Sequence, residues 1–240
     1  MITEARYAIY YTPAADSALG RFGDAWFSAE KSPDIDGFDQ QMLRRLTASA
    51  RHYGFHATLK PPFALAADAT AEALARNVAD FAADHTAFEA PPLRPAALLS
   101  FVALMPVEPC AALNRLADEC VTAFDPYRAA PSEAELDRRR ATGLSARQEE
   151  LLRSWGYPYV FEEFRFHMTL AGPTDRDQSE KLLTGLEELT RPFRAKPLVV
   201  DAVSLVAQTR PDQPFRLLRR FPLTGTSQTR PSVHQAVTTL

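Results

Sequence analysis

Hydrophobic residues recur along this chain with the spacing of short strands and amphipathic helices. Leu74, Val78 and Phe81 fall on one face of a helix over 69–84, because residues three or four apart share a side. Runs of aromatic and β-branched residues, such as 6–12, are typical of strands. The pattern predicts strands at 6–12, 53–60, 96–105, 163–171, 198–207 and 215–221, and helices at 15–29, 38–49, 69–84, 109–124, 144–155 and 176–190.

Part of this series occurs twice. Strand 53–60 is followed by a helix, a proline-containing stretch and an apolar strand, and strand 163–171 is followed by the same series. A repeat of this length predicts an α+β fold. We expect two pseudo-symmetric antiparallel sheets with flanking helices around a central cleft. Residues 1–224 should form this single bilobal domain, with its lobes interleaved in sequence, and the Ser/Thr/Gln-rich residues 225–240 a disordered tail.

Composition narrows the class of protein. The 240 residues are 46% hydrophobic and 24% charged, with a formal net charge of −3. These values are ordinary for a soluble globular protein and provide no overall basic field for a long nucleic-acid duplex. The sequence shows neither a membrane-spanning run nor a signal peptide, so we expect a cytoplasmic protein with no membrane partner. Cys110 and Cys120 sit on one predicted helix, about 15 Å apart and beyond disulfide reach, so buried free thiols are expected.

A four-residue motif occurs in both matching strands. It reads His56-Ala57-Thr58-Leu59 in the first and His167-Met168-Thr169-Leu170 in the second, and it uses two of only five histidines. Because strand side chains alternate between faces, His56, Thr58 and Lys60 are expected to share one face. Likewise Arg165, His167 and Thr169 should project together, opposite an apolar face of Phe164, Phe166, Met168 and Leu170. If the lobes pair about a pseudo-twofold axis, the two polar rows face each other.

Such a set of groups suits a phosphodiester. At neutral pH one imidazole can be neutral and accept a proton, while the other is protonated and donates one. Thr58 and Thr169 can donate hydrogen bonds to phosphate oxygens, and Arg165 and Lys60 can add charge-assisted contacts. The competing reading is a zinc site, but neither strand offers a carboxylate or a third histidine within ligand spacing. We therefore expect neither a metal nor a cofactor.

Other residues have two readings. Tyr10, Tyr53 and Tyr159 are candidates to line a substrate pocket, although Tyr10 also fits the core of a strand. The stretch 155–159 reads as a helix end and a turn, with a binding loop as the alternative. Residues 126–143, which contain Arg138-Arg139-Arg140, are expected to be a solvated insertion or loop.

The duplicated motif resembles that of the 2H phosphoesterase superfamily, which is named for a repeated His-x-Thr/Ser. The flanking sequences resemble more closely a bacterial branch described as phosphonate-metabolism proteins of unknown function. The likeness spans most of residues 6–222 and is strong in the motifs but loose between them. It is carried by Arg6–Pro13, Tyr53–Phe63, Trp155–Val160 and Phe164–Leu170.

The resemblance implies a bilobal fold with a central cleft and acid–base roles for His56 and His167. It also implies phosphate-binding hydroxyls at Thr58 and Thr169, and a small cyclic phosphate as substrate. The phosphonate association points to 5-phosphoribosyl 1,2-cyclic phosphate. Alternatives are a 2′,3′-cyclic nucleotide, an RNA end that is trimmed or joined, or binding of such a ligand without turnover. The insertion at 126–143 has no role in the basic motif and could reshape the pocket.

Overall fold

The computed structural model describes residues 5–226 of the chain and shows a mixed α/β fold with antiparallel sheets. The helices are α1 (Ala18–Trp26), α2 (Gln40–Tyr53), α3 (Ala71–Asp84), α4 (Ala111–Ala123), α5 (Glu133–Arg140), α6 (Ala146–Trp155) and α7 (Arg176–Leu189), with short 3₁₀ turns η1 (Asp125–Tyr127) and η2 (Phe161–Glu163). The strands are β1 (Arg6–Tyr11), β2 (Ala57–Ala64), β3 (Phe88–Ala90), β4 (Leu93–Leu98), β5 (Phe101–Pro106), β6 (Met168–Ala171), β7 (Leu198–Val200), β8 (Ala202–Gln208) and β9 (Arg216–Pro222).

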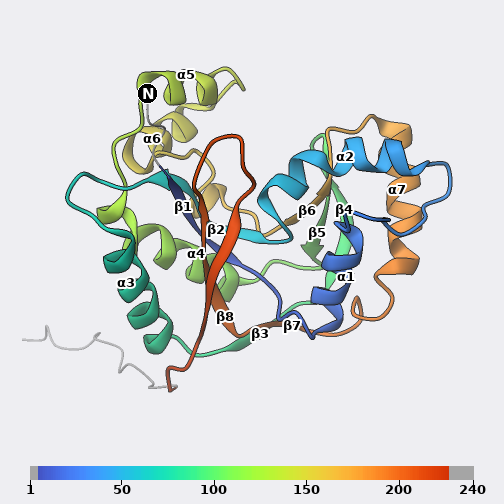
Figure 1. Cartoon of the computed structure of the whole chain (residues 1–240), viewed down its shortest axis with the longest axis horizontal. Helices are drawn as coiled ribbons and strands as arrows, with labels where there is room; N and C mark the ends of the chain where they lie inside the picture. Colours follow the sequence, from blue (N-terminus) through green and yellow to red (C-terminus); the bar gives the residue numbers. More distant parts are fainter. Residues whose placement is uncertain (1–4, 227–240) are drawn as a thin grey trace, which may run out of the picture.

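Two sheets exchange strands between the two repeats. One sheet has the order β2-β1-β8-β9 and the other the order β4-β5-β6. Helix α3 of the first repeat packs on β8 and β9 of the second, while α7 of the second packs on β4 and β5 of the first. In Figure 1, α3 and α4 therefore lie on one side of the molecule and α1, α2 and α7 on the other. The expected antiparallel sheets with flanking helices are confirmed.

A short two-stranded ladder marks where the chain passes from one sheet to the other. Strand β3 precedes β4, strand β7 precedes β8, and the two pair antiparallel with Phe88 opposite Val200 and Ala90 opposite Leu198. Both crossings therefore run side by side, at the lower centre of Figure 1. As a result, β2 and β6, which follow the two histidines, come into contact although they belong to different sheets.

Helix ends follow the signals in the sequence. The Ser145 side chain accepts a hydrogen bond from the Gln148 backbone and Gln148 returns one to Ser145, so α6 begins with a capping box. Gly156 ends the same helix in the left-handed conformation, with φ of 72°. The helix predicted over 144–155 is confirmed, with Ser145 and Gly156 as its caps.

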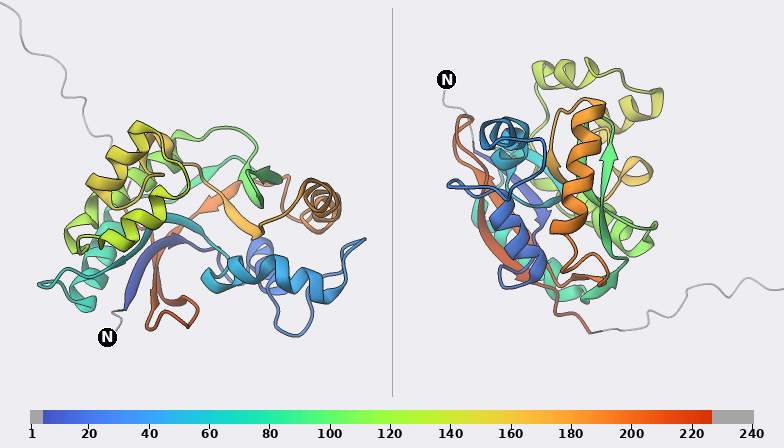
Figure 2. Two further views of the ribbon diagram at one scale, coloured as in Figure 1. Left: turned by 90° about the horizontal axis from the view of Figure 1, so that it is seen from above. Right: turned by 90° about the vertical axis from the view of Figure 1, so that its right-hand side faces the viewer.

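Three predicted elements are corrected. The strand 96–105 is the hairpin β4–β5, which starts earlier and turns at Leu99. The strand 53–60 begins only at Ala57, because Gly54 adopts φ of 79° and ends α2 there. The segment 126–143 contains helix α5, opened by a capping box between Ser132 and Glu135 that the reading as a loop overlooked. Figure 2 shows α5 and α6 stacked together at one end of the molecule.

A continuous apolar core supports the motif strands. Phe166, Met168 and Leu170 are buried, so the predicted apolar face of the second strand is confirmed. The indole Nε1–H of Trp26 donates to the Leu170 carbonyl oxygen at 3.0 Å, which ties α1 to β6 inside this core. Cys120 is buried and Cys110 half-buried, and both are free thiols, as expected.

The start of the predicted C-terminal tail is hydrogen-bonded to the rest of the fold. Gly225, at the start of the predicted tail, donates its N–H to the His85 carbonyl oxygen and accepts from the Thr86 hydroxyl. The rest of that tail, from 227 on, lies outside the described residues. Within residues 5–226, no helix combines the length and apolarity needed to span a membrane.

Candidate active site

Each motif histidine stands immediately before the first residue of its strand. His56 precedes β2 and His167 precedes β6, and these strands are in contact. In both cases the ring folds back on the main chain two residues earlier. His56 Nδ1 lies 2.9 Å from the Gly54 carbonyl oxygen, and His167 Nδ1 lies 2.7 Å from the Arg165 carbonyl oxygen. The two repeats thus place their imidazoles in the same local geometry.

These bonds fix the tautomer of each imidazole. A carbonyl oxygen can only accept, so Nδ1 carries the proton in both rings. The Nε2 atom is then left with its lone pair in the neutral form. At His56 this atom lies 3.1 Å from Thr58 Oγ1, whose hydroxyl donates to it. In both neutral rings Nε2 is therefore the nitrogen that can accept a proton.

Burial keeps both imidazoles neutral in the free protein. The pKa of His56 is lowered to about 4, mainly by burial; the hydrogen bond to Gly54 opposes the shift and a positive charge on His167 adds to it. Burial also lowers the pKa of His167, against the hydrogen bond to Arg165. At pH 7 both imidazoles are therefore neutral in the free protein. The two histidines precede β2 and β6, which are in contact.

An aromatic ring holds His56 in place. The Tyr10 ring stacks on the His56 imidazole, with centroids 3.7 Å apart and an angle of 23° between the planes. Tyr53 lies at a greater distance, 6.4 Å from the same imidazole. The Tyr10 hydroxyl is buried and has no hydrogen-bond partner among residues 5–226. Tyr159 is 39% exposed, and its ring centroid lies 5.6 Å from that of Tyr157.

The expectation that Lys60 shares a face with His56 and Thr58 is wrong. In the β1–β2 ladder Tyr10 lies opposite Thr58 but Ile9 lies opposite Lys60, because a bulge adds one residue to β2. A bulge of this kind turns the following side chain to the other face. Lys60 Nζ instead lies 2.9 Å from the Val121 carbonyl oxygen and 3.1 Å from Asp125 Oδ1, in the interior. We leave Lys60 out of the site.

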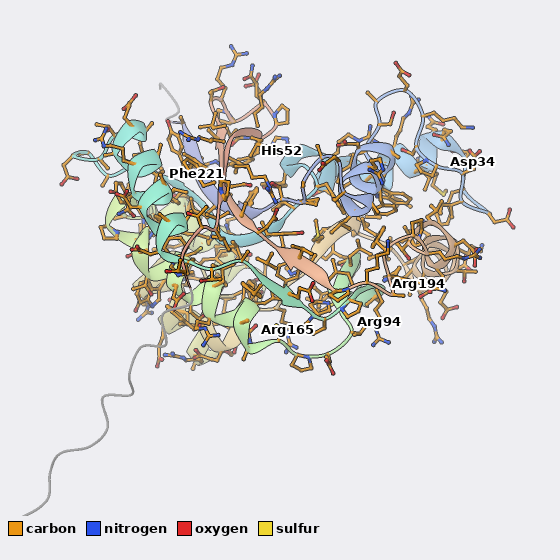
Figure 3. The ribbon with its side chains drawn as sticks, turned by 90° about the horizontal axis from the view of Figure 1, so that it is seen from below. Asp34, His52, Arg94, Arg165, Arg194 and Phe221 are labelled. Carbon is orange, nitrogen blue, oxygen red and sulfur yellow. The ribbon has the colours of Figure 1, made fainter. Side chains whose placement is uncertain are left out.

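The remaining motif residues keep the predicted alternation. Phe166 and Met168 are buried, whereas His167 and Thr169 are half-buried and Arg165 is exposed. Thr169 lies in β6 opposite Ala103, and no hydrogen bond joins it to His167. Figure 3 shows Arg165 at the surface, well apart from His52, which precedes Tyr53 in α2. The phosphate contacts predicted for Thr58, Thr169 and Arg165 stay predictions.

The structure adds two residues that the sequence reasoning did not single out. Tyr157 follows α6 and packs edge-on against Tyr159, and the guanidinium carbon of Arg139 stands 4.6 Å from the centre of the Tyr157 ring. The aromatic residues in 155–159 could have indicated Tyr157. The sequence named Arg139 only within the run Arg138–Arg140 of a solvated insertion, and its contact with Tyr157 follows from the fold, which brings α5 against residues 155–159. Among residues 5–226 no group of three or more His, Cys, Asp or Glu side chains is placed to hold a metal ion.

Comparison with known proteins gives a family and two related sequences. The family described as "Protein of unknown function (DUF1045)" matches residues 58–216. The chain is 38% identical over 231 residues to ribose 1,5-bisphosphate phosphokinase PhnN of Janthinobacterium sp. (strain Marseille), covering 92% of this chain and 51% of that protein. It is 39% identical over 175 residues to the protein of the same name from Laribacter hongkongensis (strain HLHK9), covering 71% of this chain and 40% of that protein. This chain thus spans about half the length of the relatives it matches.

Solved structures show weaker likenesses. The structure of E. coli LigT complexed with 3′-AMP has a TM-score of 0.43 and 14% identity, covering 92% of this chain and 99% of that chain. The protein TT0787 of Thermus thermophilus has a TM-score of 0.45 and 15% identity, covering 92% of this chain and 98% of that chain. At this level of similarity they carry no argument about the site.

Proposed function

This chain belongs to the DUF1045 family, whose function is not known, and we propose that it opens a cyclic phosphodiester by acid–base catalysis with His56 and His167. The observation that carries the proposal is the matched geometry of the two imidazoles. Each ring has its Nδ1 proton tied to a main-chain carbonyl and its Nε2 free to exchange a proton. Two such groups, standing before two strands that are in contact, can supply the base and the acid that assist in-line attack by water.

In the proposed reaction, water attacks phosphorus while one Nε2 takes a proton from it. The bond from phosphorus to the ring ester oxygen breaks, and the other imidazole donates its proton to that oxygen. The product is a phosphate monoester beside a free hydroxyl. We assign the base to His56, because its pKa of about 4 keeps it neutral, and the acid to His167.

The acid takes its proton from solvent, and the bound substrate anion favours this uptake. A negative phosphodiester beside two neutral imidazoles favours protonation of one of them, since an opposite charge within a few ångströms stabilises the cationic form. The Thr58 hydroxyl then has two uses. It donates to Nε2 of His56 in the free protein, at 3.1 Å, and can turn to a phosphate oxygen when the ligand binds.

A ribose phosphate is the substrate class that we propose. The related proteins are named for ribose 1,5-bisphosphate, a ribose that carries two phosphates. A cyclic ribose phosphate such as 5-phosphoribosyl 1,2-cyclic phosphate combines that sugar with the diester that two histidines can open. Such a step fits phosphonate metabolism, as the motif resemblance implies.

The direct test is phosphorus NMR of the purified protein in excess chelator. It is incubated with 5-phosphoribosyl 1,2-cyclic phosphate and, separately, with 2′,3′-cyclic nucleotides. Conversion of the sugar phosphate to a monoester supports the proposal, and conversion of the nucleotide alone would reassign the substrate to the nucleotide class. A folded protein that converts neither would contradict the proposed activity.

The pH dependence of kcat/KM follows from the two lowered pKa values. The free protein must carry a neutral His56, which requires a pH above about 4, and a protonated His167, whose pKa lies below its ordinary value. We expect kcat/KM to be highest on the acidic side, and to fall about tenfold per unit above pH ~6.5. Initial rates at low substrate concentration between pH 4.5 and 9 measure this profile. A kcat/KM that rises steadily to pH 9 would contradict the acid role.

We expect Thr58 to support catalysis through the hydrogen bond that its hydroxyl donates, and not through the packing of its side chain. Thr58→Val removes the donor while keeping the branched side chain, and should lower kcat about tenfold or more, as expected for one lost hydrogen bond to a charged group. Thr58→Ser keeps the hydroxyl and should retain most of the activity. Steady-state kinetics of both variants distinguish a hydrogen-bonding role of Thr58 from a packing role. Equal losses of kcat in the two variants would indicate a packing role.

A further inference from the structure

The loop between β8 and β9 is fastened to the end of α2, just before the turn that leads to His56. The Phe215 main-chain N–H donates to the His52 carbonyl oxygen at 2.9 Å. This carbonyl is one of the last four of α2, which have no partner within the helix. In Figure 1 the hairpin of β8 and β9 accordingly stands beside the end of α2. The loop thus holds a helix end that lies far from it in the chain.

Gln208, the last residue of β8, joins this loop to His52. Its side chain lies in the interior, with 1% of the residue exposed. The amide oxygen accepts from Arg6 Nε at 2.9 Å, and because a guanidinium can only donate, this contact fixes which way the amide faces. The amide nitrogen therefore donates to His52 Nε2 at 3.0 Å and to the Gln213 carbonyl oxygen at 2.7 Å. One buried side chain thus connects β1, the loop and α2.

The Phe215 ring packs on the two tyrosines beside His56. Its plane makes an angle of 21° with that of Tyr53, with centroids 5.3 Å apart, and its centroid lies 6.3 Å from that of Tyr10. Phe215 and Tyr10 are buried in one apolar cluster, against which Tyr53 packs. Tyr10 in turn stacks on the His56 imidazole at 3.7 Å. The loop is therefore connected to the imidazole by direct ring contacts.

The helix end held by this loop leads directly to the group that orients His56. Tyr53 is the last residue of α2, and Gly54 follows it with φ of 79°. The Gly54 carbonyl oxygen lies 2.9 Å from His56 Nδ1 and so sets the tautomer and the orientation of the ring. Because Gly54 is bonded directly to Tyr53, a shift of the helix end moves this carbonyl. The imidazole then loses its fixed orientation.

We propose that Gln208 and Phe215 are positioning residues for His56: together they hold the end of α2, and through it the Gly54 carbonyl that orients the imidazole. This inference rests on the proposed function, in which His56 is the base, and it requires neither residue to touch the substrate. Misplacing a catalytic group by about 1 Å can cost on the order of 100-fold in rate. Contacts that are remote from the reacting atoms can therefore control the rate.

Nitrogen NMR of the imidazoles tests this positioning without relying on turnover. The full chain, labelled with ¹⁵N-histidine, is compared with Phe215→Leu, and the His56 signals are assigned with His56→Ala. Phe221→Leu is the matched control, because Phe221 is also buried but lies in the main core and not in the cluster of Phe215. We expect the Nδ1–H tautomer alone in the unaltered chain and in Phe221→Leu, and loss of this single tautomer in Phe215→Leu. The Nδ1–H tautomer alone in all three proteins would overturn the proposal.

Gln208→Met and Gln213→Met form a second matched pair. The first change removes the hydrogen bonds from the Gln208 amide to Arg6, to His52 and to the loop. The second makes the same chemical change in the loop itself, where the Gln213 side chain accepts from the Thr209 hydroxyl instead. We expect His56 to lose its single tautomer only in Gln208→Met. The same spectrum in both variants would contradict the role of Gln208.

Steady-state kinetics connects the orientation of His56 to the rate. In Phe215→Leu, kcat and kcat/KM for the cyclic phosphate should fall together by about 10- to 100-fold, because the base is misplaced while substrate binding is kept. Phe215→Tyr keeps the ring and should stay within about threefold of the unaltered chain, as should Phe221→Leu. Thermal unfolding of each variant checks folding. Equal losses of kcat in Phe215→Leu and Phe221→Leu would show a general effect of core packing and overturn the proposal.

The two measurements separate this inference from the proposed function. If the unaltered chain converts no cyclic phosphate, but His56 has a single tautomer that Phe215→Leu loses, the proposed function fails and the positioning of His56 stands. If the unaltered chain converts the cyclic phosphate, and Phe215→Leu and Gln208→Met keep both the tautomer and the rate, the positioning fails and the proposed function stands.

Discussion

Alanine at His56 or at His167 is expected to lower kcat for the cyclic phosphate by about 10²- to 10⁴-fold, the usual contribution of one general acid or base. The fold should survive both changes, because each imidazole is tied to the protein mainly through one main-chain carbonyl and, at His56, through a hydroxyl and a stacked ring. Single-turnover and steady-state rates, with thermal unfolding as the check on folding, measure the effect.

His85→Ala is the matched control for these variants. His85 also stacks on an aromatic ring, Phe81, and hydrogen-bonds a main-chain carbonyl, but its Nε2 pairs with Glu119 outside the proposed site. It should keep nearly full activity. Full activity in His56→Ala would contradict the mechanism, and equal loss in His85→Ala would show that the losses arise from folding.

The two catalytic variants should differ on a substrate that needs no acid. Bis(4-nitrophenyl) phosphate releases a phenolate that leaves without protonation, so a protein that accepts this probe should be far less affected by His167→Ala than by His56→Ala. The opposite order would exchange the base and acid roles assigned here.

Asp125→Ala is expected to reduce the free energy of unfolding by about 3–5 kcal/mol, the typical cost of removing one partner of a buried ion pair. Lys60 is 1% exposed, and its ammonium would keep only the Val121 carbonyl oxygen as a partner. Burial already lowers the pKa of Lys60 to about 8 although Asp125 opposes the shift. Arg128, whose Nε lies 2.8 Å from the same carboxylate, would lose its ion-pair partner and keep the Ser154 carbonyl oxygen.

Urea unfolding measures this loss. Asp177→Ala breaks an exposed pair with Lys181, which lies 2.8 Å away on α7, and should cost no more than about 1 kcal/mol. The double variant Lys60→Met with Asp125→Ala should recover part of the loss, because no uncompensated charge then remains inside. If Asp125→Ala is as mild as Asp177→Ala, the pair does not support the fold as described here.

The motif residues were readable from sequence because their signals are local. The repeated His-x-Thr-Leu, the alternation of Phe166, His167 and Met168, and the helix limits at Ser145 and Gly156 depend on neighbours within a few residues. Local periodicity and capping determine these features, and the structure shows the predicted alternation and helix limits. The Ser132–Glu135 capping box was an equally local signal, and the charged run beside it led to the reading of α5 as a loop.

The orientation of Lys60 could not be predicted from its neighbours in sequence. Its position in the strand predicted the face of His56, but one extra residue in β2 placed it opposite Ile9. The bulge depends on pairing with β1, about 50 residues earlier in the chain, and no period-two pattern contains that information. What the residue does was then decided by α4, whose Val121 carbonyl and the following Asp125 receive the ammonium.

The sequence by itself determined the two histidine motifs, the apolar faces behind them and an antiparallel α+β fold, because each follows from residue type and short-range periodicity. Tertiary structure alone decided that β2 and β6 meet, that Tyr10 stacks on His56, and that Arg139 reaches Tyr157. These contacts join residues far apart in the chain. They form only in the folded protein, where each sheet combines strands from both repeats. Burial then lowers the pKa of both imidazoles, an effect of the surroundings that no motif encodes.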